Sequence, residues 1–241
     1  MTYGVLVNVI SPFPISVYYP LAALSAPAYP LPPPTTLVGA LAYPYHIRHR
    51  RRNESGPESP AAELLKSGKV LYASAGAEGY IQTKQVERVF QAPYLEEKYR
   101  KEPETLFSVG ARGGVNYAND ALHLFYVVKD RELADLAWGI TRIGRKEGLV
   151  AVGDVIMEEM RCREERSAVT LFYTPKRLAV CDGGAVSMPK LIPENFSERP
   201  SPEVEEFWIP QSVGAMSCAL LRDARLAEMG GFKIIVPREV C

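Results

Sequence analysis

The sequence contains few of the residues that build metal centres and disulfide frameworks. It has four cysteines and three histidines in 241 residues, and no two cysteines form a C-x-x-C pair. Structural zinc sites usually need such pairs, and small disulfide-rich proteins have a much higher density of cysteine. We therefore expect no metal, no cofactor and no dense disulfide framework.

Long apolar runs are also missing. No stretch approaches the roughly 18 uninterrupted apolar residues of a membrane span, and the start MTYGVLVNVISPFP lacks the basic region and cleavage site of a signal peptide. With 47% hydrophobic and 10% aromatic residues, the chain can still bury a sizeable core. These features predict a globular, cytoplasmic protein without a membrane contact.

The short motifs of several protein classes are absent. The sequence has no G-x-x-x-x-G-K-[ST], G-x-S-x-G, H-E-x-x-H or EF-hand pattern, which leaves a P-loop nucleotide site, a serine hydrolase, a zinc protease and a calcium sensor without support. Glycines at 110, 113 and 114 flank Arg112. They either bring backbone amides and a cation to a phosphate or form a hairpin turn, and the sequence does not decide between the two.

Negative charge is missing from the first part of the chain. Residues 1–53 contain no Asp or Glu, whereas residues 178–241 contain nine acidic and six basic residues. A polyanion should therefore approach the N-terminal part. The candidates for phosphate contact there are Arg48, Arg50, Arg51 and Arg52, in a stretch without apolar periodicity that we expect to be a surface loop.

The apolar pattern predicts an α+β fold. Residues 3–10 form a buried, central strand, and a helix begins at Thr35 or Thr36 and ends near Pro44. We further expect strands at 69–73, 79–91, 121–128 and 149–157 and helices at 61–66 and 131–140. This order suggests a ferredoxin-like or RRM-like βαββαβ unit over residues 1–157, followed by a smaller β-rich extension over 158–241.

Two groups of side chains could carry chemistry. Tyr43 and His46 could serve as acid and base in a metal-independent ribonuclease, although plain phosphate binding by a basic loop is the favoured interpretation. The second group consists of the basic residues beside Gly144, which we predict to be the C-cap of the helix over 131–140. Basic residues beside such a cap suit the helix dipole, and they could also orient an RNA backbone or a partner subunit.

Three stretches carry a resemblance to a known family. They are PLPPPTTLVGALAYPY, RGGVNYANDALHLFYVV and RIGRKEGLVAV, in this order between about residues 3 and 157. In them the chain resembles the Cas-five subunit of CRISPR Cascade surveillance complexes, a branch of the RAMP superfamily, and more narrowly its archaeal type I-A form. Residues 158–241 offer no match.

The resemblance implies an RRM-like palm with a protruding thumb at about residues 95–120. It also implies a non-catalytic role: holding the five-prime repeat handle of the guide RNA, beside the large subunit and a backbone subunit, in a complex that meets target DNA. The implied RNA contacts are Arg112, Tyr117, Arg142, Arg145 and Lys146. Some relatives cleave precursor RNA, but the Lys-His pair that would accompany Tyr43 and His46 is missing here. An endoribonuclease and a protein-only scaffold remain the alternatives.

Overall fold

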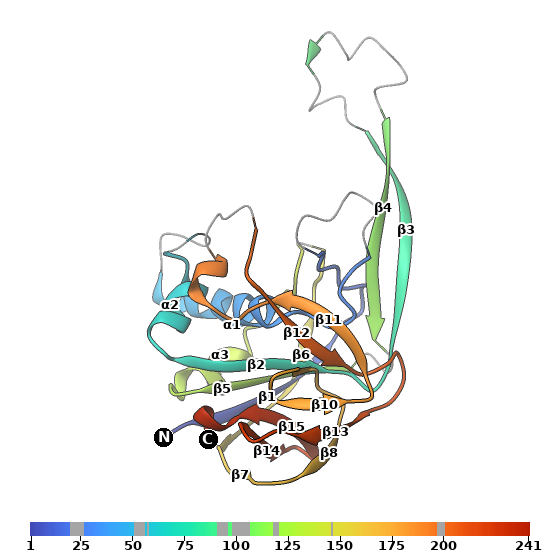
Figure 1. The fold of residues 1–241 in the computed structure, drawn as a ribbon. Helices are drawn as coiled ribbons and strands as arrows, with labels where there is room; N and C mark the ends of the chain where they lie inside the picture. The colour runs from blue at the N-terminus through green and yellow to red at the C-terminus, as the bar shows by residue number, and fades with distance from the viewer. Residues whose placement is uncertain are drawn as a thin grey trace.

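A four-stranded antiparallel sheet organises the first part of the chain (Figure 1). The computed structural model describes residues 1–19, 27–50, 56, 58–90, 96–97, 107–117, 121–145, 147–196 and 201–241. The sheet has the order β2-β5-β1-β6. Its strands are β1 (Tyr3–Ile10), β2 (Val70–Gly76), β5 (Ala121–Val128) and β6 (Ala151–Glu159). The predicted α+β class, with several antiparallel sheets and few helices, is confirmed.

Strand β1 is central and buried on both faces, as predicted. It pairs with β5 on one side and with β6 on the other, and Val5 lies opposite Tyr126. Val5 and Val7 belong to one hydrophobic cluster, whereas Leu6 between them belongs to another. Because successive side chains point to opposite faces, a strand covered on both sides is apolar throughout rather than alternating.

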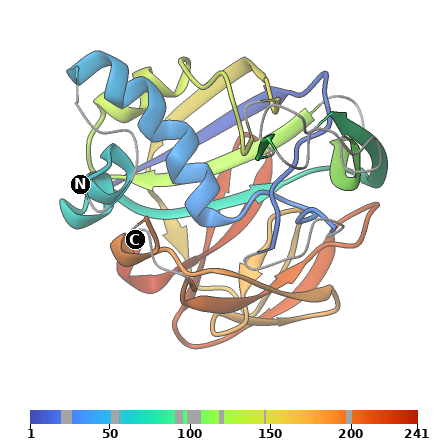
Figure 2. The same cartoon turned by 90° about the horizontal axis from the view of Figure 1, so that it is seen from above.

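Three α-helices lie in the described residues: α1 (Pro34–His49), α2 (Pro60–Lys66) and α3 (Glu132–Ala137). Figure 2 shows α1 lying across the strands of the sheet. The predicted end of α1 near Pro44 is wrong. A proline inside a helix removes one hydrogen bond and crowds the carbonyl four residues earlier, but Pro44 is buried in the core. A Cβ on Gly139, which follows α3, would lie 2.7 Å from the Pro44 Cβ. No helix among the described residues is long and apolar enough to cross a membrane.

Helix α3 is shorter than expected, which changes the role of Gly144. The helix ends at Ala137 and its C-cap is Trp138, so Gly144 is not a helix cap. Gly144 instead has a φ of +75° in a turn that precedes β6. The prediction of a C-cap was wrong because the apolar pattern of a helix continued into residues that pack in a turn.

A long hairpin rises from the body of the molecule (Figure 1). It consists of β3 (Tyr80–Phe90) and β4 (Phe107–Tyr117), which pair along their whole length. Strand β4 falls in the stretch proposed as a thumb, whose residues 95, 98–106 and 118–120 lie outside the described residues.

The glycines of β4 have a structural explanation. A Cβ on Gly114 would lie 2.9 Å from the Pro14 Cβ, and the Ser16 hydroxyl donates a hydrogen bond to the Gly113 carbonyl oxygen at 2.6 Å. They therefore let the segment after β1 approach the base of the hairpin. The interpretation as a hairpin turn is wrong, because these glycines lie within a strand, whereas phosphate contact by this segment stays a prediction.

The C-terminal part contains three antiparallel three-stranded sheets. Strands β7 (Cys162–Arg163), β14 (Ala224–Met229) and β15 (Phe232–Pro237) form one. Strands β8 (Ser167–Thr170), β10 (Ala179–Cys181) and β13 (Met216–Leu220) form the second, and β9 (Thr174–Pro175), β11 (Gly184–Pro189) and β12 (Val204–Ile209) the third. Two short 3-10 helices, η5 (Pro193–Phe196) and η6 (Arg238–Val240), complete this part.

The sheet of β7, β14 and β15 covers the face of the central sheet that lies opposite α1. Leu6, Phe125 and Val127 of the sheet share a cluster with Phe172 and Ile234 of the C-terminal part. In Figure 1, β14 and β15 accordingly lie below the sheet with α1 above it, whereas β11 and β12 lie on the same side as α1. In the described part of the chain, both faces of the sheet are therefore covered at its centre, where β1 and β5 lie.

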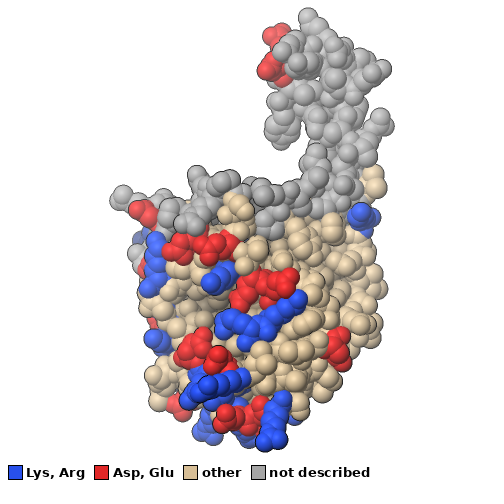
Figure 3. All heavy atoms as spheres, viewed as in Figure 1, with Lys and Arg blue, Asp and Glu red and all other residues tan. Residues whose placement is uncertain are grey.

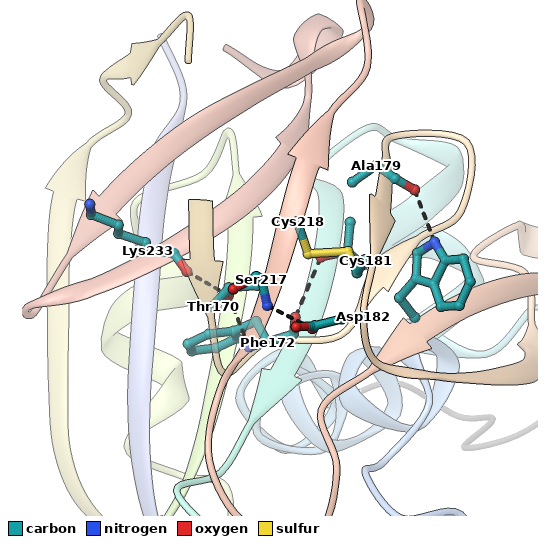
Figure 4. Close-up of a disulfide and its surroundings, with 10 residues drawn as sticks. Thr170, Phe172, Ala179, Cys181, Asp182, Ser217, Cys218 and Lys233 are labelled. Carbon is teal, nitrogen blue, oxygen red and sulfur yellow. Dashed lines mark hydrogen bonds between the residues drawn. A yellow bond between two sulfur atoms is a disulfide. The ribbon is translucent and has the colours of Figure 1, made fainter. Parts of the chain in front are cut away.

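Two disulfides hold the C-terminal part. Cys162 is bonded to Cys241, and Cys181 is bonded to Cys218 (Figure 4). All four cysteines are therefore paired, which the sequence did not predict, although two bonds do not make the dense framework that the cysteine content excludes. The number of cysteines does not predict these bonds, because the bonded cysteines are far apart in the sequence. One pair meets through the pairing of β10 with β13, and the other through the return of the C-terminus to β7.

Candidate nucleic-acid interface

A hydrogen-bonded turn precedes strand β6 and carries two of the predicted RNA contacts. We name residues 142–145 the arginine turn. It is closed by a hydrogen bond from the Ile143 amide to the Gly148 carbonyl oxygen at 2.9 Å. A Cβ on Gly144 would lie 2.7 Å from the Ser16 carbonyl oxygen, so only glycine allows this close approach to the segment after β1.

Each arginine of the turn lies over a tyrosine ring. The Arg145 guanidinium carbon is 3.9 Å from the centroid of the Tyr18 ring, and that of Arg142 is 5.7 Å from the Tyr43 centroid. Both arginines are exposed. A guanidinium held by its flat face still presents its N–H groups at the edge, where they can donate to phosphate oxygens. The turn thus presents two oriented cations to solvent.

Tyr18 is a residue of this site that sequence reasoning missed. It follows a Pro-rich segment and is far from Arg145 in the sequence. Only the packing of residues 15–18 between β4 and the arginine turn brings the two together. No spacing or motif indicates this contact.

A small pocket adjoins the arginine turn, with a volume of about 220 Å³. It brings together Tyr43 and His46 of α1, which the sequence analysis treated as a pair, and Arg142 of the turn, which belonged to another group. The rest of its lining consists of Gly39, Ala42, Gly56, Ser59, Pro60, Ala61 and Phe196. The pocket therefore combines an apolar floor, aromatic rings and one cation.

The group of arginines that begins at Arg48 starts within helix α1, whereas the sequence predicted a surface loop for the whole group. Arg48 lies in the last turn of α1, and Arg50 is the C-cap with a φ of 48°; both side chains are exposed. Basic residues there also suit the negative end of the helix dipole, which gives this cluster a structural explanation as well. Arg51, Arg52 and Lys146 lie outside the described residues.

Tyr117 is not available for base stacking. Its side chain is 5% exposed, and its hydroxyl donates a hydrogen bond to the Pro30 carbonyl oxygen at 3.1 Å. Burial raises the pKa of this hydroxyl well above its usual value. The ring is therefore part of the core, which corrects its assignment as an RNA contact. Arg112 lies on β4 opposite Gln85, and its side chain is outside the described part of the structure.

His123 is a core residue, as predicted. It is 6% exposed, its Nδ1 lies 2.8 Å from the Asn8 Oδ1, and its ring packs on Phe232 at 4.4 Å between centroids. Burial lowers the pKa of this imidazole, so that the neutral form is favoured, with Nδ1–H donating to Asn8. His123 therefore has a packing role.

Charge on the described surface is mixed rather than separated into two signs. Figure 3 shows Lys and Arg next to Asp and Glu over one face. Several are ion pairs of the C-terminal part, such as Lys176 with Glu206 and Arg177 with Glu205, each at 2.7 Å. The excess of acidic residues there is thus partly used within the fold.

Curated proteins of Saccharolobus solfataricus (strain ATCC 35092 / DSM 1617 / JCM 11322 / P2) are similar to this chain. The CRISPR system aCascade subunit Cas5 1 is 33% identical over 150 residues, and the CRISPR-associated protein Cas5 3 is 35% identical over 152 residues. The resemblance to the Cas5 family is confirmed. Each alignment covers 61% of this chain and 61% of the relative. A third protein, Cas5 2, is 24% identical over 87% of this chain and 83% of its own length.

The fold has a counterpart among solved structures. The crystal structure of a CRISPR protein from Archaeoglobus fulgidus superposes with a TM-score of 0.61 at 18% sequence identity, over 98% of this chain and 99% of that chain. This likeness includes the C-terminal part, for which the sequence offered no match. No protein-family model matches the chain.

Proposed function

We propose that this chain is a non-catalytic, RNA-binding subunit of a Cascade-type CRISPR complex, which holds the five-prime repeat handle of the guide RNA. The observation that carries the proposal is the arginine turn, where Arg142 and Arg145 are exposed over tyrosine rings. The printed names of the Cas5 relatives, one of them an aCascade subunit, support the same assignment.

The topology supports an RRM-like palm with a thumb. Strand β1 leads through α1 to β2, β5 leads through α3 to β6, and the order β2-β5-β1-β6 is the one expected for a βαββαβ unit. The hairpin of β3 and β4 is inserted between β2 and β5 and takes the place of a thumb. We assign residues 1–157 to this unit and 158–241 to a β-rich extension that packs on it.

RNA binding by this surface would rest on phosphate contacts, with specificity from unpaired bases. Arginines contribute affinity through the phosphates, whereas bases are read when they are unstacked and held on aromatic groups. A handle held in this way needs neighbours on its other side. The proposed partners are the large subunit and a backbone subunit of the complex, and target DNA would be met through the assembly.

An endoribonuclease is the second candidate, because Tyr43 and His46 line one pocket with Arg142. Purified protein incubated with labelled repeat RNA in EDTA distinguishes the two. Intact RNA is the expected result, and cleavage that is lost in a His46→Ala variant would replace the non-catalytic assignment. A protein-only scaffold would bind no guide RNA even within the assembled complex.

The proposal is tested by the RNA affinity of variants of the turn. Arg145→Gln should weaken the binding of single-stranded RNA and reduce the log–log salt slope by about 0.7, the value for one lost phosphate contact. Arg222→Gln, at an exposed arginine after β13, is the matched control and should leave the slope unchanged. Equal slopes for both variants and the wild type would refute the assignment.

A further inference from the structure

Gly39 is a helix-interior glycine that the fold of the chain does not explain. Glycine is among the least favourable residues inside a helix, because it loses more backbone entropy than alanine. Elsewhere close packing requires glycine: a Cβ on Gly139 or Gly144 would lie 2.7 Å from its nearest neighbour. Around Gly39, by contrast, no atom of the described residues lies within 4 Å of an added Cβ.

The open space over Gly39 belongs to the pocket beside the arginine turn. Gly39 and Tyr43 are one turn apart on the exposed side of α1, and His46 lies about one turn further along. Pro60 and Ala61 of α2 and Phe196 of η5 complete the apolar lining. The missing side chain thus leaves the backbone of α1 accessible at the floor of the pocket.

We infer that this pocket binds one unstacked nucleobase of a single-stranded RNA, an inference that rests on the proposed function. A flat ring can lie directly on the α1 backbone only where no Cβ intervenes, which explains a glycine at residue 39. Aromatic side chains that line the pocket offer faces for stacking, as in proteins that recognise single-stranded RNA. The volume of about 220 Å³ suits one ring system rather than a peptide segment.

The polar groups of the pocket suit a nucleotide better than an apolar side chain of a partner protein. Ser59 Oγ accepts a hydrogen bond from the Ala62 amide at 3.3 Å, and its own hydroxyl hydrogen can still donate to the edge of a base. Arg142 lies both in the pocket lining and on the arginine turn. A base in the pocket would therefore have its phosphate beside the oriented guanidinium groups.

The test separates stability from binding with two substitutions at one position. Because no described residue lies near the added Cβ, Gly39→Ala should raise the melting temperature, and Gly39→Leu should still fold. The probe is a single-stranded RNA of roughly 12 nucleotides, within the usual range of site sizes, that carries thiouridine for photocrosslinking. We expect crosslinks to the lining residues in the wild type, fewer in Gly39→Ala and none in Gly39→Leu, with RNA affinity reduced about ten-fold by leucine. Gly184→Ala, where an added Cβ has only ordinary contacts, is the control and should change neither.

The outcomes distinguish this inference from the proposed function. If wild type and Gly39→Leu bind the RNA equally and crosslink at the same residues, the base pocket is refuted while RNA binding stands. If Gly39→Leu folds, binds RNA normally and instead loses a partner subunit, the pocket holds a protein side chain and the inference is wrong. If the wild type binds no RNA even in its assembled complex, the proposed function itself fails.

Discussion

Arg145 and Tyr18 form a stacked pair in which the guanidinium carbon lies 3.9 Å from the ring centroid. The Arg145 amide is also 3.4 Å from the Ser16 carbonyl oxygen, so the backbone and the side chain of Arg145 both contact the segment after β1. A guanidinium fixed in this way loses less conformational entropy when it meets a phosphate. Arg145 is therefore a preorganised cation at the surface.

Removing the tyrosine platform should weaken RNA binding without removing a charge. Tyr18→Leu is expected to lower the affinity for single-stranded RNA roughly two- to five-fold, which corresponds to about 0.5–1 kcal/mol for an exposed cation–π contact. The salt slope should stay unchanged, because the phosphate contact itself remains. Fluorescence anisotropy over a salt series measures both quantities, and a reduced slope would contradict this role for Tyr18.

Substitutions of Tyr117 should change stability and leave RNA affinity alone. Tyr117→Phe removes the hydrogen bond to Pro30 and should cost about 1 kcal/mol of unfolding free energy. Tyr117→Ala creates a cavity in the core and should cost roughly 3–5 kcal/mol. Urea unfolding measures the stability of each variant, and titration with RNA measures the affinity of the folded variants. A loss of RNA affinity in the well-folded phenylalanine variant would return this residue to the binding surface.

The two disulfides should contribute strongly to stability. Cys162–Cys241 spans a separation of 79 residues and Cys181–Cys218 one of 37, so that the first encloses the second. Loss of either bond should lower the unfolding free energy by about 2–5 kcal/mol. Cys162→Ser and Cys241→Ser should have similar effects, because both remove the same bond. Equal melting temperatures with and without a reducing agent would contradict this prediction.

The sequence predicts the central sheet well because each strand is marked by its own run of apolar residues. The strand predicted at residues 121–128 has the same bounds as β5, and the almost entirely apolar residues 3–10 indicate that β1 is central. The failures concern features that depend on distant partners. Helix α1 continues through Pro44 because α3 covers that proline, and β4 tolerates its glycines because Pro14 approaches them.

The candidate site was predicted in pieces, and only the fold assembles it. Tyr43, His46 and Arg142 were selected for their chemistry, but nothing in the sequence shows that they line one pocket. Tyr117 was misassigned because an aromatic residue beside glycines and an arginine reads as a binding residue, whereas its burial depends on Pro30. The sequence does not indicate Gly39 as a site residue, since a small residue in a helix usually allows close packing.

Stability should fall as the pH drops below the usual pKa of histidine. Burial lowers the pKa of His123 below 6.5, so the unfolded chain takes up a proton that the folded protein resists. This contribution to stability is complete above 6.5 and is lost as the pH falls through the folded pKa. Unfolding free energies at about pH 7.5 and about pH 5.5 should differ less in a His123→Gln variant than in the wild type. An equal difference in both proteins would show that other groups cause the loss.

The most direct test of the account is the salt dependence of RNA binding when both arginines of the turn are replaced. In the double variant Arg142→Gln, Arg145→Gln, the log–log slope for single-stranded guide RNA should decrease by about 1.4, since two phosphate contacts are lost. The melting temperature should hardly change, because both side chains are exposed. An unchanged slope in a folded double variant would contradict the claim that this turn holds the RNA.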